Sequence, residues 1–271
     1  MSRVRSQERG RPQWWSCCQP PPVRLQQRMS LIYCTPGGTV DRRNHNLHRQ
    51  VSLSDRAVAR TGRRRSLDSS DWDDRYRCVE HPWGSAPAAA LSARFAELTP
   101  GRAVDLGCGD GRHARWLADA GWTVHAVDFS SVAIELARSG GEDRSIDYTV
   151  ADVRAWEPSE PVELVAIGFL HLPVDELVAV IAGAASWLAP SGRLLYLGHA
   201  LENFTHGIGG PPDPSILPAI DDLARAASGL QVRELGHLVR PFGEGRAIDV
   251  LLHAQPWGTA AHRDLKNGTF T

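Results

Sequence analysis

Lysine, cysteine and long apolar runs are all scarce in this chain. Lys266 is the only lysine, so almost every basic residue is an arginine. The five cysteines form no CxxC pair, which argues against a zinc site, any other metal site or a redox motif, and their odd number favours a reducing, cytoplasmic setting. The most apolar stretch, residues 178–189, falls well short of the ~20 residues that cross a bilayer. We therefore expect no membrane span and no membrane partner.

Charge is balanced in total but divided unevenly along the chain. The formal net charge is −1, yet residues 1–70 hold fourteen arginines and only four acidic residues. The rest of the chain is acidic, which makes nucleic acid an unlikely main partner because phosphate binding needs a basic face. The sequence predicts a disordered basic extension over 1–68, a folded domain over 69–255 and a frayed tail over 256–271. An organelle transit peptide, or a later translation start at Met29, would also account for the extension.

Short apolar segments alternate with helical patterns through the predicted domain. The pattern predicts strands over 103–106, 123–127, 146–150, 162–167, 193–197, 231–239 and 246–254. It predicts helices over 86–98, 113–120, 174–188 and 216–227, with shorter ones from Ser70 or Asp71 and from Ser130 or Ser131. Strands that alternate with helices indicate an α/β fold with a doubly wound, mostly parallel sheet.

A glycine-rich turn follows the first predicted strand and precedes a helix, in the segment Asp105-Leu106-Gly107-Cys108-Gly109-Asp110-Gly111. Ligands of open α/β sheets bind at the carboxyl ends of the strands, and glycine lets a ligand approach the backbone closely. The spacing GxGxG lacks the third glycine of the dinucleotide fingerprint. Acids at 105 and 110 disfavour pyrophosphate, whereas they favour the ammonium and sulfonium groups of S-adenosylmethionine.

Two more acids follow the next two predicted strands. Asp128 ends the second strand, where a carboxylate can accept both hydroxyls of a ribose. Asp152 follows the third strand and can accept a hydrogen bond from an adenine amino group. A single such acid is more often a cap or turn residue, but three acids at three strand ends together with the glycine turn form a specific pattern.

These segments, with Ala126-Val127-Asp128-Phe129-Ser130, Ala151-Asp152-Val153 and Trp72-Asp73-Asp74-Arg75-Tyr76, resemble the class I S-adenosylmethionine-dependent methyltransferases. The variant is similar to small bacterial enzymes of the tellurite-resistance and thiopurine type, over roughly residues 70–255. The resemblance implies a Rossmann-like seven-stranded sheet with an antiparallel last strand. It also implies cofactor-binding residues: Asp105, Gly107 and Gly109 at the methionine part, Asp128 at the ribose, and Asp152 with Val153 at the adenine, with Phe129 as a further cofactor-binding residue.

The methyl acceptor is less well defined by the sequence. We expect a small molecule, either a thiol, a chalcogen oxyanion or a natural-product hydroxyl. His171 and His199 follow the fourth and fifth strands and are candidates for a general base, although each can equally be a loop or capping residue. Trp72 and Tyr76 can shield the sulfonium by cation–π contact, or can be core residues that hold the first helix.

Two other functional classes fit parts of the pattern. A nicotinamide-dependent oxidoreductase would use a related turn, but the acids and the missing third glycine count against it. A non-catalytic regulatory protein that binds S-adenosylmethionine would account for the lack of a clear acceptor motif. A monomer and a homodimer are both compatible with the sequence.

Overall fold

The computed structural model describes residues 68–78, 81, 83–140 and 144–258. The predicted extension therefore lies outside the described residues except for Asp68, and so does most of the predicted tail. Within the described ranges, no helix combines the length and the apolar character needed to cross a membrane.

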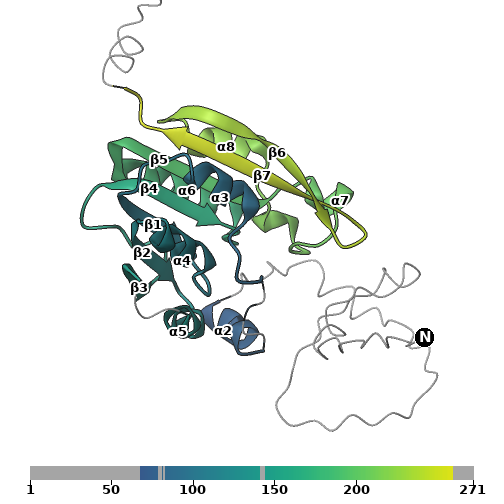
Figure 1. Cartoon of the computed structure of the whole chain (residues 1–271). Helices are drawn as coiled ribbons and strands as arrows, with labels where there is room; N and C mark the ends of the chain where they lie inside the picture. The colour runs from purple at the N-terminus through teal and green to yellow at the C-terminus, as the bar shows by residue number, and fades with distance from the viewer. Residues whose placement is uncertain (1–67, 79–80, 82, 141–143, 259–271) are drawn as a thin grey trace, which may run out of the picture. The chain divides into compact units, whose positions relative to one another are not determined.

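Seven strands form one sheet in the order β3-β2-β1-β4-β5-β7-β6 (Figure 1). The strands are β1 (Arg102–Leu106), β2 (Thr123–Asp128), β3 (Ile146–Val150), β4 (Val162–Gly168), β5 (Leu188–His199), β6 (Gln231–Phe242) and β7 (Gly245–Gln255). The first five strands pair in parallel, and β7 runs antiparallel to both β5 and β6. The predicted seven-stranded, mostly parallel sheet with an antiparallel last strand is confirmed.

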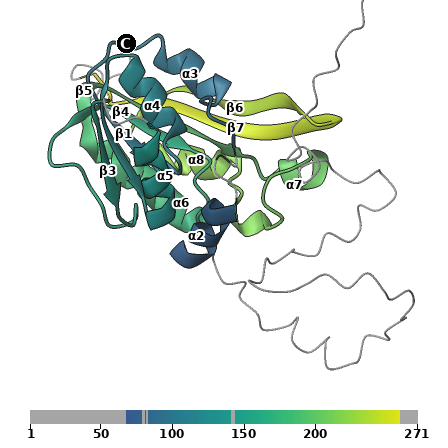
Figure 2. The same cartoon turned by 60° about the horizontal axis from the view of Figure 1, so that its bottom comes forward.

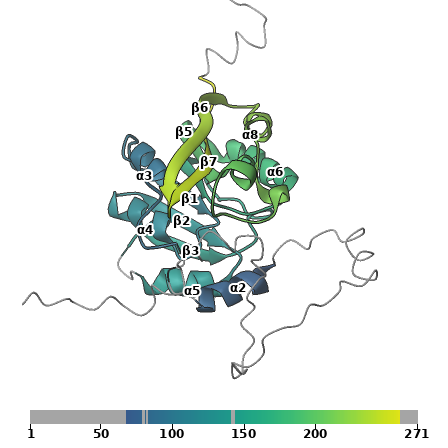
Figure 3. The same ribbon diagram turned by 90° about the vertical axis from the view of Figure 1, so that its right-hand side faces the viewer.

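Helices cover both faces of this sheet (Figure 3). They are α2 (Ser69–Cys78), α3 (Ala89–Phe95), α4 (Arg112–Asp119), α5 (Ser131–Ser139), α6 (Val174–Ala184), α7 (Asn203–His206) and α8 (Ile220–Ala226), with the 3-10 turns η2 (Ala185–Trp187) and η3 (Pro214–Ile216). One apolar core includes Leu177 of α6 and Leu223 of α8, and a second includes Leu91 of α3 and Leu117 of α4. All four leucines are fully buried, and each contributes about 1.5–3 kcal/mol of hydrophobic stabilisation.

Several predicted boundaries were wrong. The helix predicted over 174–188 ends at Ala184, and β5 begins at Leu188 rather than at residue 193. Leu188 pairs with Val162 and Arg193 with Leu164, so the extra residues of this register shift lie on β5 and include Pro190, which cannot donate to the ladder. The helix predicted from 216 begins only at Ile220, because the residue before Pro218 is extended.

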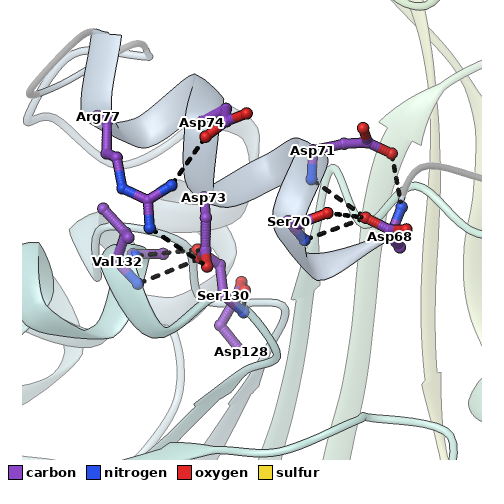
Figure 4. Close-up of polar contacts among 10 residues, drawn as sticks. Asp68, Ser70, Asp71, Asp73, Asp74, Arg77, Asp128, Ser130 and Val132 are labelled. Carbon is purple, nitrogen blue, oxygen red and sulfur yellow. Dashed lines mark hydrogen bonds and ion pairs between the residues drawn. The ribbon is translucent and has the colours of Figure 1, made fainter.

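The start of α2 is also held differently from the prediction. The Ser70 hydroxyl donates to Asp68, and the Asp71 carboxylate accepts from the backbone N–H of Asp68, at 3.0 Å, so neither is the N-cap residue. The carboxylate of Asp68 instead accepts hydrogen bonds from the backbone N–H groups of Ser70 and Asp71, at 3.1 and 3.2 Å (Figure 4). Ser130, in contrast, caps α5 as one of the two predicted candidates, since its hydroxyl accepts from the backbone N–H of Ala133.

Candidate cofactor and acceptor site

The glycine turn joins β1 to α4 at the carboxyl edge of the sheet. The backbone N–H groups of Gly107 and Cys108 both donate to the carbonyl oxygen of Val127 on β2, at 2.8 and 3.0 Å. Gly107, Gly109 and Gly111 all have positive φ, at 68°, 56° and 79°. A side chain at either of the first two positions would be strained and would also collide, with Leu170 at Gly107 and with the Tyr76 hydroxyl at Gly109. The turn therefore needs glycine where the sequence supplies it.

Asp105 lies beneath this turn as a buried, unpaired carboxylate. It is 0% exposed, and neither of its oxygens has a hydrogen-bond partner among the described residues. Burial raises the pKa of Asp105 from 3.8 to about 7. The backbone N–H of Ala114 and the guanidinium of Arg112 offset part of this rise, although neither group is placed to form a hydrogen bond or an ion pair with the carboxylate. An unpaired buried carboxylate costs stability, and a cation at this edge of the sheet would remove that cost.

Asp128 links the glycine turn to the end of β2. Its carboxylate accepts hydrogen bonds from the backbone N–H groups of Gly109 and Ser130, each at 2.9 Å. Burial raises its pKa, although these two N–H donors oppose the rise. A carboxylate offers about four acceptor sites, so two remain for a ligand such as a pair of ribose hydroxyls.

Helix α2 lies beside α5 (Figure 2), and Figure 4 shows Asp73 of α2 on the side of Ser130 and Asp128. Asp73 of α2 accepts hydrogen bonds from the hydroxyl of Ser130 at 2.6 Å and from the backbone N–H of Val132 at 3.3 Å. Asp73 lies in the segment that carries the family resemblance, but the sequence alone predicted no role for this residue. Its position within the Trp72–Tyr76 motif is the signal that could have found it.

Asp152 and Val153 follow β3, as expected, but their side chains are already engaged. Arg154 binds the carboxylate of Asp152 through Nε and Nη2 and also reaches Glu176 on α6, at 2.8 Å. The Arg154 hydrogen bonds lower the pKa of Asp152. The side chain of Val153 is 8% exposed and belongs to a hydrophobic core. Phe129 stands next to Asp128 and is half-buried.

Trp72 and Tyr76 project from α2 toward the turn. The Tyr76 hydroxyl packs on Gly109, and burial raises the pKa of this phenol. The indole ring of Trp72 contacts both the guanidinium of Arg75, at 5.0 Å, and the ring of His171, at 5.8 Å. The structure therefore places Tyr76 on the glycine turn and the Trp72 ring beside Tyr76, with ring centroids 6.2 Å apart and with the Trp72 ring already in contact with one cation.

The two candidate bases lie together at the ends of β4 and β5. The rings of His171 and His199 stack with centroids 6.3 Å apart. Burial lowers the pKa of His171 to about 3, with further contributions from His199 and Arg75, so His171 is neutral at physiological pH.

His199 is held by a buried acid that the sequence analysis missed. Its Nδ1 lies 2.9 Å from an oxygen of Asp249 on β7, in contact but not aligned as a hydrogen bond. The other Asp249 oxygen accepts from Arg240 Nε at 2.6 Å. Asp249 is 2% exposed. Its contact with His199 depends on the β5–β7 pairing, which local sequence patterns do not reveal.

Comparison with known proteins agrees with the fold and the glycine turn. Residues 103–192 match the family model described as a methyltransferase domain. Trans-aconitate 2-methyltransferase of Streptomyces avermitilis is 30% identical over 138 residues, which cover 46% of this chain and 49% of that protein. The chain thus spans about half the length of the curated relatives it matches.

Solved structures extend the likeness over most of the described domain. TehB from Haemophilus influenzae aligns with a TM-score of 0.56 at 17% identity, over 69% of this chain and 67% of that one. N-methyltransferase NodS from Bradyrhizobium japonicum, solved with S-adenosyl-L-homocysteine, aligns with a TM-score of 0.55 at 14% identity, over 70% of this chain and 100% of that one. At these identities the likeness concerns the fold.

Sheet order, glycine turn and flanking acids together define a Rossmann-like fold of the methyltransferase class. Within this fold, residues 103–192 match the methyltransferase-domain model, and the curated relatives that align with the chain are themselves named as methyltransferases, so the domain resembles the S-adenosylmethionine-dependent methyltransferases.

The glycine turn yields a direct prediction. Substitution Gly109→Ala should abolish detectable binding of S-adenosylhomocysteine and lower the melting temperature by about 2–4 °C, because a φ of 56° costs alanine about 1 kcal/mol and its Cβ meets Tyr76. Calorimetric titration and thermal unfolding measure the two effects. Gly183→Ala is the matched control, since Gly183 lies on α6 with open space around its Cα and should leave binding unchanged. Equal binding by both variants would contradict the role of the turn.

Proposed function

We propose that this protein transfers a methyl group from S-adenosylmethionine to a small-molecule acceptor. The observation that carries the proposal is the unpaired Asp105 carboxylate, buried beneath a positive-φ glycine turn next to Asp128. Relatives named for trans-aconitate, for ubiquinone biosynthesis and for the cypemycin N-terminus each match part of the chain, so the likeness supports the reaction and leaves the acceptor open.

These residues fit the cofactor by charge and by shape. Asp105 and the glycines Gly107 and Gly109 would hold the methionine part, where a carboxylate favours an ammonium or sulfonium. The two free acceptor sites of Asp128 would hold the ribose hydroxyls, with Phe129 alongside.

At the adenine, Asp152 and Val153 remain the proposed neighbours. Since Arg154 occupies the Asp152 carboxylate, an adenine amino group would have to share that carboxylate with the guanidinium. The Trp72 and Tyr76 side chains would cover the reacting edge of the site and exclude water from it.

When bound, S-adenosylmethionine supplies an electrophilic methyl carbon on a sulfonium. The protein's part is to align the acceptor and, where the acceptor is protonated, to accept its proton. Of the two candidate histidines, we assign the base to His199, because the Asp249 carboxylate 2.9 Å from Nδ1 favours a proton on that nitrogen and leaves Nε2 as the proton acceptor. His171, with a pKa of about 3, is a poor base. Its neutral imidazole would instead position the methyl acceptor through a hydrogen bond.

Cofactor discrimination tests the proposal. We expect the full chain to bind S-adenosylhomocysteine in the micromolar range and to show no binding of NAD⁺ up to about 1 mM, because Asp105 and Asp110 repel a pyrophosphate. Equilibrium dialysis against each ligand measures both affinities on the same preparation. Tighter binding of NAD⁺ would favour an oxidoreductase, and binding of neither ligand would end the proposal.

A further inference from the structure

A chain of ring contacts borders the glycine turn on the side of α2 and the ends of β4 and β5. Trp72 stacks on His171, His171 stacks on His199, and His199 in turn contacts Phe169 with centroids 5.1 Å apart. Phe169 has a φ of 58°, which non-glycine residues rarely adopt and which is commonest at functional sites. Leu170, between Phe169 and His171, packs on Gly107, so this row of rings lies next to the turn.

Two arginines and Trp83 connect the two ends of this row, so that the contacts form a closed set. We call this set the arginine–aromatic ring; its members are Trp72, Arg75, Trp83, Arg112, Phe169, His171 and His199. The guanidinium of Arg75 lies 5.0 Å from the Trp72 ring and 5.6 Å from the Trp83 ring. On the other side, the guanidinium of Arg112 lies 5.7 Å from the Phe169 ring and donates to the Trp83 carbonyl oxygen at 3.1 Å. Two cations thus flank Trp83, and two imidazoles lie between Trp72 and Phe169.

Neither arginine of the ring has an acid partner among the described residues, in contrast to several other arginines of the domain. Within the described ranges, neither Arg75 nor Arg112 forms an ion pair, whereas Arg154 binds two carboxylates and Arg240 binds Asp249. Asp105 and Asp110 influence Arg112 electrostatically without reaching ion-pair distance. Burial lowers the pKa of the Arg112 guanidinium, which reflects its partial loss of water. Two guanidinium groups without acid partners, both in contact with Trp83 and each beside an aromatic ring, suit a planar anion with an apolar body.

We propose that the arginine–aromatic ring binds the methyl acceptor, and that this acceptor is an organic anion carrying a separate hydroxyl. The inference rests on the proposed methyl transfer. The anionic group would bind Arg75 and Arg112, the apolar body would lie against Trp72 and Phe169, and the hydroxyl would face His199. In the transfer, the hydroxyl proton passes to His199 Nε2, an O–C bond forms with the methyl group, and the C–S bond breaks to leave a neutral thioether.

Calorimetry on the full chain saturated with S-adenosylhomocysteine tests the proposal with defined probes. The probes are 4-hydroxycinnamate, 4-hydroxybenzoate, their methyl esters and selenite. We expect at least one of the two acids to bind at least about tenfold more tightly than its ester, because the ester loses its charge-assisted hydrogen bonds. In the double variant Arg75→Gln, Arg112→Gln, the affinity for the acid should fall to that of the ester, while the ester's affinity stays unchanged.

Controls separate this inference from the proposed function. Arg225→Gln removes an exposed guanidinium on α8 outside the ring and should keep the preference for the acid. Each variant must bind S-adenosylhomocysteine, and the single variant Arg75→Gln replaces the double one if Arg112→Gln disturbs the neighbouring turn. Suppose that the wild-type chain binds S-adenosylhomocysteine but binds neither acid below about 10 mM. That result, or a preference for the esters or for selenite, would contradict the proposal that the acceptor is an organic anion. If it does not bind S-adenosylhomocysteine, the proposed function itself fails.

Discussion

Replacing Asp128 by alanine should weaken the binding of S-adenosylhomocysteine by at least about 100-fold. The carboxylate has two free acceptor sites after binding Gly109 and Ser130, and each hydrogen bond from a ribose hydroxyl to a charged acceptor is worth about 1.5–3 kcal/mol. The variant also loses the acceptor that holds the Gly109 N–H in place. Isothermal titration of the ligand into wild-type and variant chains measures the loss.

Two further variants exclude a trivial loss of structure. Asp128→Asn keeps the size of the side chain and removes its charge, and it should give an intermediate affinity with an unchanged circular dichroism spectrum. Asp147→Ala removes a largely exposed carboxylate from the neighbouring strand β3 and should bind like the wild type. An Asp128→Ala chain that is folded and binds with wild-type affinity would remove Asp128 from the site.

Replacing Asp105 by asparagine should stabilise the ligand-free protein while weakening its ligand binding. Folding raises the pKa of Asp105 from 3.8 to about 7. The contribution of this group to the free energy of unfolding is therefore fully present below pH 3.8, and it is lost as the pH rises through about 7. Since each pKa unit is worth about 1.4 kcal/mol, the wild type carries a cost of about 4 kcal/mol at pH 8. Asparagine has no charge to bury and avoids this cost.

Denaturant unfolding at several pH values measures this effect. The stability difference between Asp105→Asn and the wild type should reach about 4 kcal/mol near pH 8 and disappear near pH 4, where both side chains are neutral. Asp221→Asn, an exposed change on α8, should show no such pH dependence. A difference that stays constant with pH, or an Asp105→Asn chain that binds S-adenosylhomocysteine as tightly as the wild type, would show that the buried charge does not serve the ligand.

The sheet and the glycine turn were predictable because their signals are local. Alternating apolar and polar segments predict the strands, and the turn between β1 and α4 needs positive φ at Gly107, Gly109 and Gly111, which the sequence shows directly. Asp128, which ends β2, was placed at this edge by chain order alone, since the carboxyl ends of parallel strands meet there.

The acceptor side was less predictable because it depends on contacts between distant segments. His199 meets Asp249 only through the antiparallel β5–β7 pairing, fifty residues along the chain. Arg75 and Arg112 come together at Trp83, in a connection with no periodic pattern. The same limit applies to the end of α6, where the pairing of Leu188 with Val162 overrides the helical pattern that continues past Ala184.

A crystal structure of the full chain with S-adenosylhomocysteine is the most direct test of the central claim. We predict that the ribose hydroxyls bind the carboxylate of Asp128, and that the amino-acid part lies over Gly107 and Gly109 with its ammonium directed toward Asp105. The thioether sulfur should face the rings of Trp72 and His171. A ligand bound away from the carboxyl ends of β1 and β2, or one that makes no contact with Asp128, would contradict this account.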